Sequence, residues 1–556
     1  MPLVVSTPAE KMTEPYPRRW WALVVLCLSL LIVVMANTSL IVAAPDMTTD
    51  LGLSSSDLQW VVDGYTVPYA ALMLVLGSIG DMYSRRGALI VGLLIFAAGS
   101  VTGGLVHGTD LVVVARAIMG VGAAVVMPAT LSLLVAIFPR AERAKAITAW
   151  TATSGLAVAA GPLAAGWLLE SHAWGSTFLM NVPVALLGVV GALFLVPPSK
   201  ATTAGGIDYV GGLLSIVTVG SLVYATIEGP HFGWGAGTVA AAVLAAVGLP
   251  AFVAWELRHP HPMLDVRKFR ERPFSGSMLA VMFFFFGTFG SIYYSTQFLQ
   301  FVLGYNALET GVRLLPLAGA VFAGSAVTGR LAPKLGVKRV VGTGMAIGTA
   351  GVLLLTRIES GSTYTDFLAP LLLLGFAIGL SVSPATDTVM GSFPESELGV
   401  GGGANDTALE LGASLGIAVL GSLLATSYKD KLTDLAGGHL PAAAMDVARD
   451  SVGGGIAVAE QVAKSPDGGP QQARTLVAAV HESFAHAIAH TSLVGGVIMA
   501  AGTVLVLLVL PGRRRSTGQD RQTEPAQAQA QTEREADRDA EPAELAEPAQ
   551  DANSVH

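Results

Sequence analysis

Two carboxyl side chains, Asp406 and Glu410, stand in an otherwise apolar and small-residue stretch, GGGANDTALELGASLG at 401–416. Placing one charge in a membrane helix costs about 2.5–3.5 kcal/mol on insertion scales, so such acids are candidates for function. Four residues apart, they share one helix face. Burial and a second nearby acid both disfavour the ionised form, so the pair can accept a proton on one side of a membrane and release it on the other. A lipophilic cation could displace that proton.

Each acid also has an ordinary structural interpretation. Asp406 lies near one end of its predicted helix, where it could cap the helix or face water, whereas Glu410 lies deeper. Asp63, in LQWVVDGYTVPYA, lies about one turn inside another predicted helix. It is either a proton or cation site at an outer mouth or an interfacial residue that caps its helix. Asp387 lies in a further apolar stretch, and the sequence assigns it neither role.

An arginine and a run of aromatic residues join these candidates. Arg116, in RAIMGVGAA, is costly within a membrane unless it is paired or hydrated, so we expect it to take part in proton coupling. The segment MFFFFGTFGSIYYSTQFLQ offers Tyr293, Tyr294 and Gln297 as cavity residues, since ring faces can hold a cation. An aromatic run in a membrane helix can equally face lipid or serve packing.

The sequence gives no pattern for a metal, a cofactor or an enzyme. His481, His486 and His490 are spaced by five and four residues, which does not bring all three cleanly onto one helix face. There is no phosphate-binding loop and no nucleophile elbow. We therefore expect no metal, no cofactor, no enzymatic activity and no nucleic-acid partner. Coupling must then come from an ion gradient, in which each proton contributes about 2.3 kcal/mol per 100 mV.

The elements that position these residues are predicted to be membrane helices. Of the 556 residues, 52% are hydrophobic and 13% are charged, whereas about 25% of a soluble domain is charged. A crossing needs about 20 mostly apolar residues, and unbroken apolar runs of that length form helices rather than barrel strands. We predict fourteen spans, at 20–43, 60–80, 88–106, 111–138, 145–169, 177–197, 208–228, 236–257, 275–300, 309–330, 338–357, 367–390, 401–426 and 489–511.

Lysine and arginine are unevenly distributed between the two ends of these spans. With the N-terminus in the cytoplasm, 21 basic residues flank the inner ends and two, Arg313 and Arg357, flank the outer ends. Because basic residues favour the cytoplasmic side, both termini are predicted to be cytoplasmic. The inner group is Lys11, Arg18, Arg19, Arg85, Arg86, Arg140, Arg143, Lys145, Lys200, Arg258, Arg267, Lys268, Arg270, Arg272, Arg330, Lys334, Lys338, Arg339 and Arg513 to Arg515.

These predictions divide the chain into five parts. They are a cytoplasmic N-terminus (1–19), a first six-helix half (20–200), two inserted helices (205–258), a second six-helix half (273–511) and a cytoplasmic tail (512–556). The second half includes a long extracellular loop at 427–488, in which small and apolar residues at helical spacing predict short amphipathic helices. The tail is of low complexity and charged, which predicts disorder.

The two halves share a trace of duplication. GSIGDMYSRRGALI at 77–90 follows the second predicted helix, and GRLAPKLGVKRVVG at 329–342 follows the tenth. In both, a glycine precedes a basic cluster that leads into the next helix. Duplicated halves are typical of transporters in which one half rocks against the other.

Six stretches in order carry a resemblance to a known family. GSIGDMYSRRG resembles the loop motif G-x-L-A-D-R-x-G-R-R/K of the major facilitator superfamily, RAIMGVGAA its fourth-helix arginine motif, and AAGPLAAGWL the glycine-proline motif of its antiporters. FLMNVPVAL, HPMLDVRKFRERPF and LGYNALETGVRLLPLA are similar to the fourteen-helix drug:proton antiporters, most closely the quaternary-ammonium and dye exporters of the QacA/SmvA type. The resemblance covers 18–511 and implies an all-α polytopic major facilitator fold.

In that family the loop after the second helix latches the two halves together on the cytoplasmic side in the outward-open state. The matching residues here are Gly77, Asp81, Arg85 and Arg86, and the alternative for Arg86 is a plain topology signal.

The fifth-helix motif places Gly161 and Pro162 at a bend with close helix packing.

Within the apolar helices, some residues match the family pattern and others differ from it. Glu410 and Asp63 each match an acid of the quaternary-ammonium exporters. Ala36 stands where the first helix of this branch usually has an aspartate, and Val321 where some exporters of divalent cations have one. These departures predict that dicationic drugs are poorer substrates.

Together these features predict a monomeric exporter in a bacterial inner membrane that exchanges protons for lipophilic cations such as quaternary ammonium compounds and dyes. An exporter of a self-made antibiotic or other metabolite would share the fold, and a neutral cargo would tolerate the loss of Glu410. A membrane receptor or scaffold without transport is the alternative of another class. The duplicated loop and the buried acids speak against it.

Overall fold

In the computed structural model, all regular secondary structure among the residues that it describes is helical. These are residue 8 and residues 14–512 without 54, 202–207, 233, 437–439 and 465–468. Within them, fourteen helices are long and apolar enough to cross a membrane, the number that the sequence predicts. The predicted tail beyond Gly512 and most of the predicted N-terminal segment lie outside the described residues.

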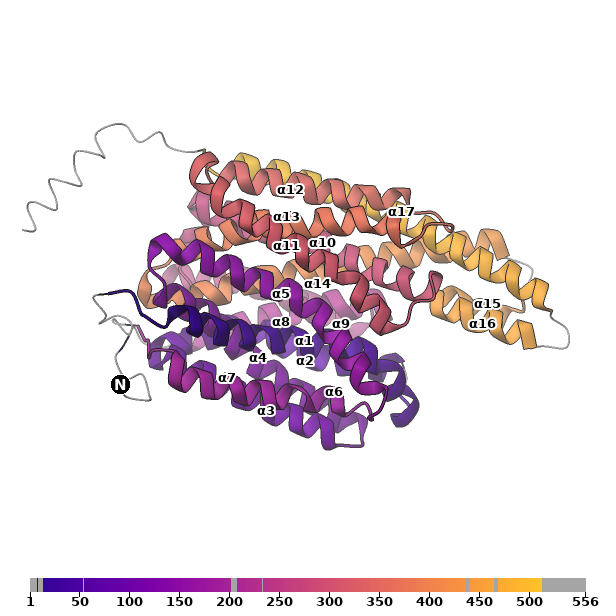
Figure 1. Ribbon diagram of the computed structural model, residues 1–556, viewed down its shortest axis with the longest axis horizontal. Coiled ribbons are helices and arrows are strands. Elements are labelled where there is room, and N and C mark those ends of the chain that lie inside the picture. The colour runs from indigo at the N-terminus through magenta and orange to yellow at the C-terminus, as the bar shows by residue number, and fades with distance from the viewer. Residues whose placement is uncertain are drawn as a thin grey trace, which may run out of the picture. The chain divides into compact units, whose positions relative to one another are not determined.

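The helices of the first half lie side by side (Figure 1). They pack around an apolar core that includes Phe96 and Met119. The hydroxyl of Ser84 accepts the N–H of Gly87 and so caps the helix that follows. The predicted sixth span is interrupted at Met180, which separates two helices. The elements are α1 (Arg19–Leu51), α2 (Ser55–Tyr83), α3 (Arg85–Leu105), α4 (Thr109–Ile137), α5 (Arg140–Leu169), α6 (Ser176–Leu179) and α7 (Asn181–Leu195).

The second half has its own apolar core, which includes Phe284 and Phe367. Its second long helix starts with a capping box, in which Asn306 and Glu309 each accept the other's backbone N–H. The elements are α10 (Arg272–Gln297), η3 (Phe298–Val302), α11 (Ala307–Leu335), α12 (Val337–Leu354), η4 (Leu355–Arg357), α13 (Tyr364–Gly391), η5 (Glu395–Glu397), α14 (Leu398–Ala436) and α17 (Pro470–Val509).

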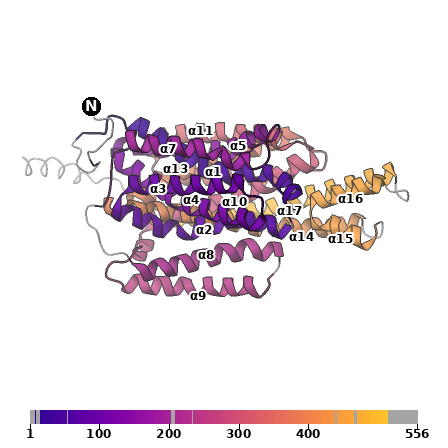
Figure 2. The ribbon, with the colours of Figure 1, turned by 90° about the horizontal axis from the view of Figure 1, so that it is seen from below.

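The two inserted helices, α8 (Tyr209–Phe232) and α9 (Ala236–Arg258), form a hairpin beside the two halves (Figure 2). α8 packs against α2 and α14, so it contacts both halves. Large aliphatic side chains of α9, among them Val243, Leu244 and Val247, are exposed, as expected of a face turned toward lipid. A short helix, η2 (Val266–Arg270), leads from the hairpin to α10.

The predicted loop at 427–488 is shorter in the structure, because both flanking helices extend into it. Tyr428, Leu432 and Ala436 recur every four residues on α14 and are buried, so protein packing continues the helix beyond its apolar stretch. Two short helices, α15 (Ala442–Asp450) and α16 (Val452–Lys464), follow as expected, and Figure 1 shows them beside the ends of α14 and α17. The hydroxyl of Tyr428 donates to the carbonyl of Ala448 over 3.0 Å.

The halves meet along two main helix pairs, α2 with α14 and α5 with α11. α4 also packs on α14, and α5 on α13. Along the second pair, Gly155 of α5 faces Val321 of α11. The hydroxyls of Thr148 on α5 and Ser383 on α13 are hydrogen-bonded at 3.0 Å. Several of these contacts use glycine or a small polar residue, which allows the helix backbones to approach closely.

Candidate functional site

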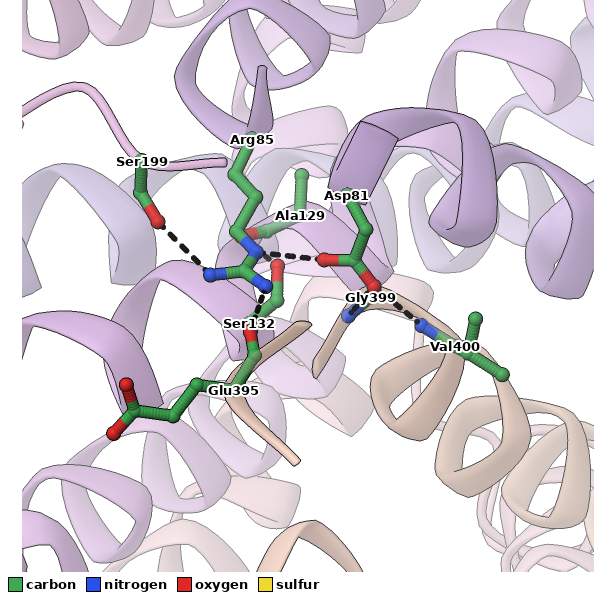
Figure 3. A network of polar contacts seen from close by, with 8 residues as sticks. All are labelled: Asp81, Arg85, Ala129, Ser132, Ser199, Glu395, Gly399 and Val400. Carbon is green, nitrogen blue, oxygen red and sulfur yellow. Dashed lines mark hydrogen bonds and ion pairs between the residues drawn. The ribbon is translucent and has the colours of Figure 1, made fainter. Parts of the chain in front are cut away.

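Asp81, near the C-terminal end of α2, connects the two halves (Figure 3). Its Oδ2 accepts the backbone N–H groups of Gly399 over 2.6 Å and of Val400 over 3.2 Å. α14 begins at Leu398, so these N–H groups belong to its first turn and have no partner within the helix. A carboxylate here also complements the positive end of the helix dipole.

Arg85, in the first turn of α3, completes this contact from the other side. Its Nε donates to Asp81 Oδ1 over 2.6 Å, and its Nη1 donates to the hydroxyl of Ser199 over 2.9 Å. Its Nη2 donates to the carbonyl of Glu395, in η5 of the second half (Figure 3). Arg85 is 1% exposed. We call Asp81 and Arg85, with these second-half backbone groups, the latch.

Gly77 lies one helical turn before Asp81, where α2 crosses α14. A Cβ atom on Gly77 would lie 2.3 Å from the carbonyl oxygen of Gly399, and one on Gly399 would lie 2.3 Å from the carbonyl oxygen of Gly77. Two helix backbones can approach this closely where neither residue has a side chain. The glycine of the loop motif therefore sets the distance at which Asp81 reaches α14.

Arg86 and the second copy of the motif behave differently. The Nη1 of Arg86 donates to the carbonyl of Val196 over 3.2 Å, which ties α3 to the end of α7 within the first half. Gly329, the counterpart of Gly77, has no atom within 4 Å of an added Cβ. The two duplicated loops are thus alike in sequence, but the glycine of the first loop, unlike that of the second, lies where two helices cross closely.

Asp406 lies within α14, eight residues after the helix begins, and is 1% exposed. It therefore neither caps the helix nor faces water. Its Oδ1 accepts from the amide of Asn405 over 3.1 Å, and the amide oxygen of Asn405 accepts from the hydroxyl of Thr386 on α13 over 3.1 Å. Among the described residues, Asp406 Oδ2 is buried without a hydrogen-bond partner and no basic side chain forms an ion pair with this acid.

Glu410 follows one turn later on the same helix. Its side chain is half-buried. It lies within electrostatic range of Asp406 and of Tyr65 and Tyr69 on α2. The rings of Tyr65 and Tyr69 are stacked with centroids 5.6 Å apart. The predicted acid pair thus faces aromatic side chains of the opposite half.

Arg116 is fully buried, and its partners are neutral. It donates to the carbonyl of Val61 over 3.0 Å, to the carbonyl of Ala36 over 3.2 Å and to Asn37 Oδ1 over 3.3 Å. Its guanidinium carbon lies 4.4 Å from the ring centroid of Tyr65. The arginine therefore fixes α1, α2 and α4 to one another, and Ala36, which replaces the aspartate of the resemblance, supplies a backbone acceptor.

Asp63 is buried in α2, with 1% of its surface exposed, and so is not an interfacial cap. Its Oδ1 accepts from the amide of Gln59 over 3.1 Å, one turn earlier on the same helix. Its Oδ2 is buried and has no hydrogen-bond donor among the described residues. This acid lies near the end of α2 opposite to the latch.

The glycine-proline motif lies where α5 contacts two neighbours. A Cβ on Gly161 would come within 2.0 Å of Thr38 Oγ1 on α1, so the α1–α5 contact requires a glycine. Pro162, one residue later, faces Gly311 of α11. These positions set close packing within the first half and between the halves.

The aromatic candidates on α10 separate into two groups. The Tyr294 hydroxyl donates to Ser291 Oγ over 3.1 Å and accepts from Ser492 Oγ of α17 over 2.8 Å, so this tyrosine packs inside the second half. That corrects its prediction as a cavity residue, because the aromatic run winds around the helix and Tyr294 falls on the face toward α17. Tyr293 and Gln297 are half-buried, and they stay candidates.

No three His, Cys, Asp or Glu side chains among the described residues form a group that could hold a metal ion. The predicted histidines lie along α17, where the His490 ring is hydrogen-bonded through Nδ1 to Ser427 Oγ of α14 at 2.9 Å.

Comparison with known proteins decides the family. A sequence model described as Major Facilitator Superfamily matches residues 26–417. The chain belongs to the major facilitator superfamily. Multidrug efflux pump LfrA of Mycolicibacterium smegmatis is 33% identical to this facilitator over 507 residues, which cover 90% of this chain and 98% of the relative. Tetracenomycin C resistance and export protein of Streptomyces glaucescens is 30% identical over 513 residues, 91% and 93% of the two chains.

Methyl viologen resistance protein SmvA of Salmonella typhimurium is 30% identical to the facilitator over 502 residues, 89% and 97% of the two chains. Among solved structures, the human organic anion transporter MFSD10 aligns with a TM-score of 0.55 at 13% identity over 87% of this chain and all of that one. A likeness at this identity shows the fold alone. The facilitator is thus a multi-pass protein of a bacterial inner membrane and belongs with the drug exporters of its superfamily.

Sequence reasoning missed one electrostatic interaction between the facilitator's two halves. Asp387 on α13 lies within electrostatic range of Arg143 on α5, and Arg143 also donates to the carbonyl of Val135 over 2.9 Å. From the sequence, Arg143 contributes only to the predicted topology, and Asp387 has no assigned role. In the sequence, an acid in an apolar helix and a base at the start of another helix show no connection. The connection appears only in the structure, where α5 packs against α13.

Proposed function

We propose that this facilitator exports lipophilic cations in exchange for protons, as a monomer. The relatives' names speak of multidrug efflux, of methyl viologen resistance and of tetracenomycin C export. The observation that carries the proposal is the acid pair on α14. Asp406 and Glu410 lie inside the protein, and no basic side chain among the described residues forms an ion pair with either.

Such a pair binds either protons or a cation. With a proton bound, a carboxyl group is neutral and tolerates burial; without it, the charge needs a counter-ion. A lipophilic cation is that counter-ion, and the rings of Tyr65 and Tyr69 offer it aromatic faces. Proton and cation then compete for one place, and competition at one site is sufficient for exchange.

The latch connects this exchange to the contact between the two halves. α14 carries both Glu410 and the N–H groups that Asp81 holds, so a change of charge at the acids acts on the helix whose first turn closes the predicted cytoplasmic end. Opening that end requires Asp81 and Arg85 to leave the second-half backbone. The two states of the transporter then differ in whether these hydrogen bonds are made.

Export of a self-made antibiotic is the second candidate, and the tetracenomycin C exporter among the relatives favours it. A neutral or anionic metabolite gains nothing from a carboxylate in its site. The charge at Glu410 therefore separates the two candidates.

The test is proton-driven ethidium transport into energised inside-out vesicles, with the wild type compared with Glu410→Gln and Asp406→Asn. Asp430→Asn, an exposed acid on the same helix, is the matched control. The proposal predicts loss of transport in Glu410→Gln, a strong reduction in Asp406→Asn and no change in Asp430→Asn, at equal protein insertion. Full transport in both site variants would overturn the assignment to α14. Absence of transport in the wild type would favour the metabolite candidate.

A further inference from the structure

We propose that Asp63 of α2 and Glu228 of α8 form a carboxylic acid dyad that binds one proton between them and so gives the inserted hairpin a part in ion coupling. The proposal rests on the proton exchange proposed above. It adds a second proton site, on other helices than the one that carries Glu410, and a residue that the sequence did not single out.

The two side chains meet where α8 packs on α2. Asp63 is 1% exposed and Glu228 is 7% exposed, and their carboxyl groups lie within electrostatic range of each other. One oxygen of each acid, Asp63 Oδ2 and Glu228 Oε1, is buried without a donor among the described residues. The other oxygen of Asp63 is held by Gln59, which fixes the orientation of the group.

Two ionised carboxylates cannot satisfy each other, because each is an acceptor without a donor. Side by side in a buried place they also repel, and no basic side chain among the described residues forms an ion pair with either. One proton resolves both problems, since the protonated acid donates to the ionised one. The two acids of such a pair hold that proton in common.

Other titratable groups near the dyad are turned toward different partners. Tyr224, one turn before Glu228 on α8, lies within electrostatic range of both acids, and its ring contacts that of Trp60 with centroids 6.0 Å apart. Arg116 of α4 donates to the carbonyl of Val61 and lies over Tyr65.

On α14, which packs against both α2 and α8, Glu410 and Asp406 face Tyr69 rather than Asp63.

The dyad lies far from the latch along the same helix. Asp63 and Asp81 are 18 residues apart on α2, which at 1.5 Å per residue is about 27 Å. The distribution of lysine and arginine predicts that the Asp63 end faces the outside, where protons enter. Loss of the shared proton leaves two facing charges, which loosens α8 from α2. The hairpin contacts both halves, so its hold on α2 becomes dependent on the proton.

The test counts protons in purified, lipid-reconstituted protein without substrate. Infrared difference spectra between low and high pH report protonated buried carboxyl groups through their carbonyl stretching band. The variants are Asp63→Asn, Glu228→Gln and the double substitution, and the control is Glu170→Gln, an exposed acid at the same predicted end. An amide in either position supplies the missing donor, so the remaining acid no longer needs a proton.

A shared proton predicts that each single variant loses the same one-proton signal and that the double variant loses no more. The control keeps the full signal. Additive losses, with the double variant losing the sum of the two singles, would show two independent acids and overturn the dyad. An unchanged signal in all three variants would overturn it as well.

Ethidium transport provides a second test of the dyad. In inside-out vesicles, the proposal predicts that ethidium transport by the three dyad variants responds less to the pH of the vesicle interior than wild-type transport does, and equally so in all three. Because the infrared measurement needs no substrate, failure of the drug-export proposal would still leave the dyad testable. Loss of the infrared signal with unchanged transport would separate the proton site from coupling and overturn the hairpin's role.

Discussion

The carboxylate of Asp81 on α2 accepts the backbone N–H of Gly399 on α14 over 2.6 Å. A residue of the first half thereby caps the first turn of the helix that carries Asp406 and Glu410 in the second. The cap is strong because the acceptor is charged, the donors are free helix N–H groups and Arg85 holds the second carboxylate oxygen. The contact of the latch with α14 therefore depends on a single acid.

The substitution Asp81→Asn is expected to open the latch. It keeps the shape of the side chain but leaves the guanidinium of Arg85, 1% exposed, without its counter-charge. Removing one partner of a buried ion pair costs about 3–5 kcal/mol, and about 1.4 kcal/mol already shifts an equilibrium tenfold. Spin labels at the exposed residues Tyr83 and Gly391, in a Cys27→Ser background, should show a longer distance between the halves. An unchanged distance distribution would show that the latch does not hold the closed state.

Gly77→Ala should weaken the same contact by steric means. The added Cβ would lie 2.3 Å from the carbonyl oxygen of Gly399, so the helices must separate, and overpacking of this kind costs about 1–3 kcal/mol. Gly329→Ala, at the matching position of the second half, has open space and should be neutral or slightly stabilising. Ethidium transport and thermal unfolding of both variants check this. Equal effects of the two substitutions would contradict the role assigned to the glycine crossing.

The sequence predicted much of the fold because membrane helices are specified by local composition. Each apolar run is visible by itself, and so are Asp81 and Arg85 in their motif. Their partners are not visible, because Gly399 and Val400 contribute N–H groups and Glu395 a carbonyl, which nearly every residue has.

The same limit applies to Glu228. A single acid near the end of an apolar run reads as an interfacial residue, and the packing of α8 on α2 is what brings it to Asp63. The extension of α14 past its predicted span has a similar cause. Tyr428 and Leu432 are buried by protein there, which hydropathy does not register.

The electrostatic interaction of Arg143 with Asp387, which also joins the halves, should contribute to the same closed state. Arg143→Gln and Asp387→Asn are each expected to reduce transport, and the double substitution should reduce it by less than the product of the two effects, because one interaction is lost in all three. Glu142→Gln is the matched control, since Glu142 pairs at 2.6 Å with Arg19 inside the first half. Independent effects of the two substitutions, multiplying in the double variant, would show that Arg143 and Asp387 do not act together.

Arg116→Lys is expected to abolish most transport although the positive charge is kept. The guanidinium reaches three acceptors on two helices at once, the carbonyls of Val61 and Ala36 and the side-chain oxygen of Asn37. An ammonium is a compact point charge and does not reproduce this fork, and each buried acceptor left without a donor costs about 1–3 kcal/mol. Thermal unfolding should shift down and ethidium transport should fall about tenfold or more. Arg140→Lys, at an exposed position, should leave both unchanged. If Arg116→Lys transported at the wild-type rate, a positive charge alone would suffice for transport. The hydrogen bonds by which Arg116 connects α1, α2 and α4 would then not be needed.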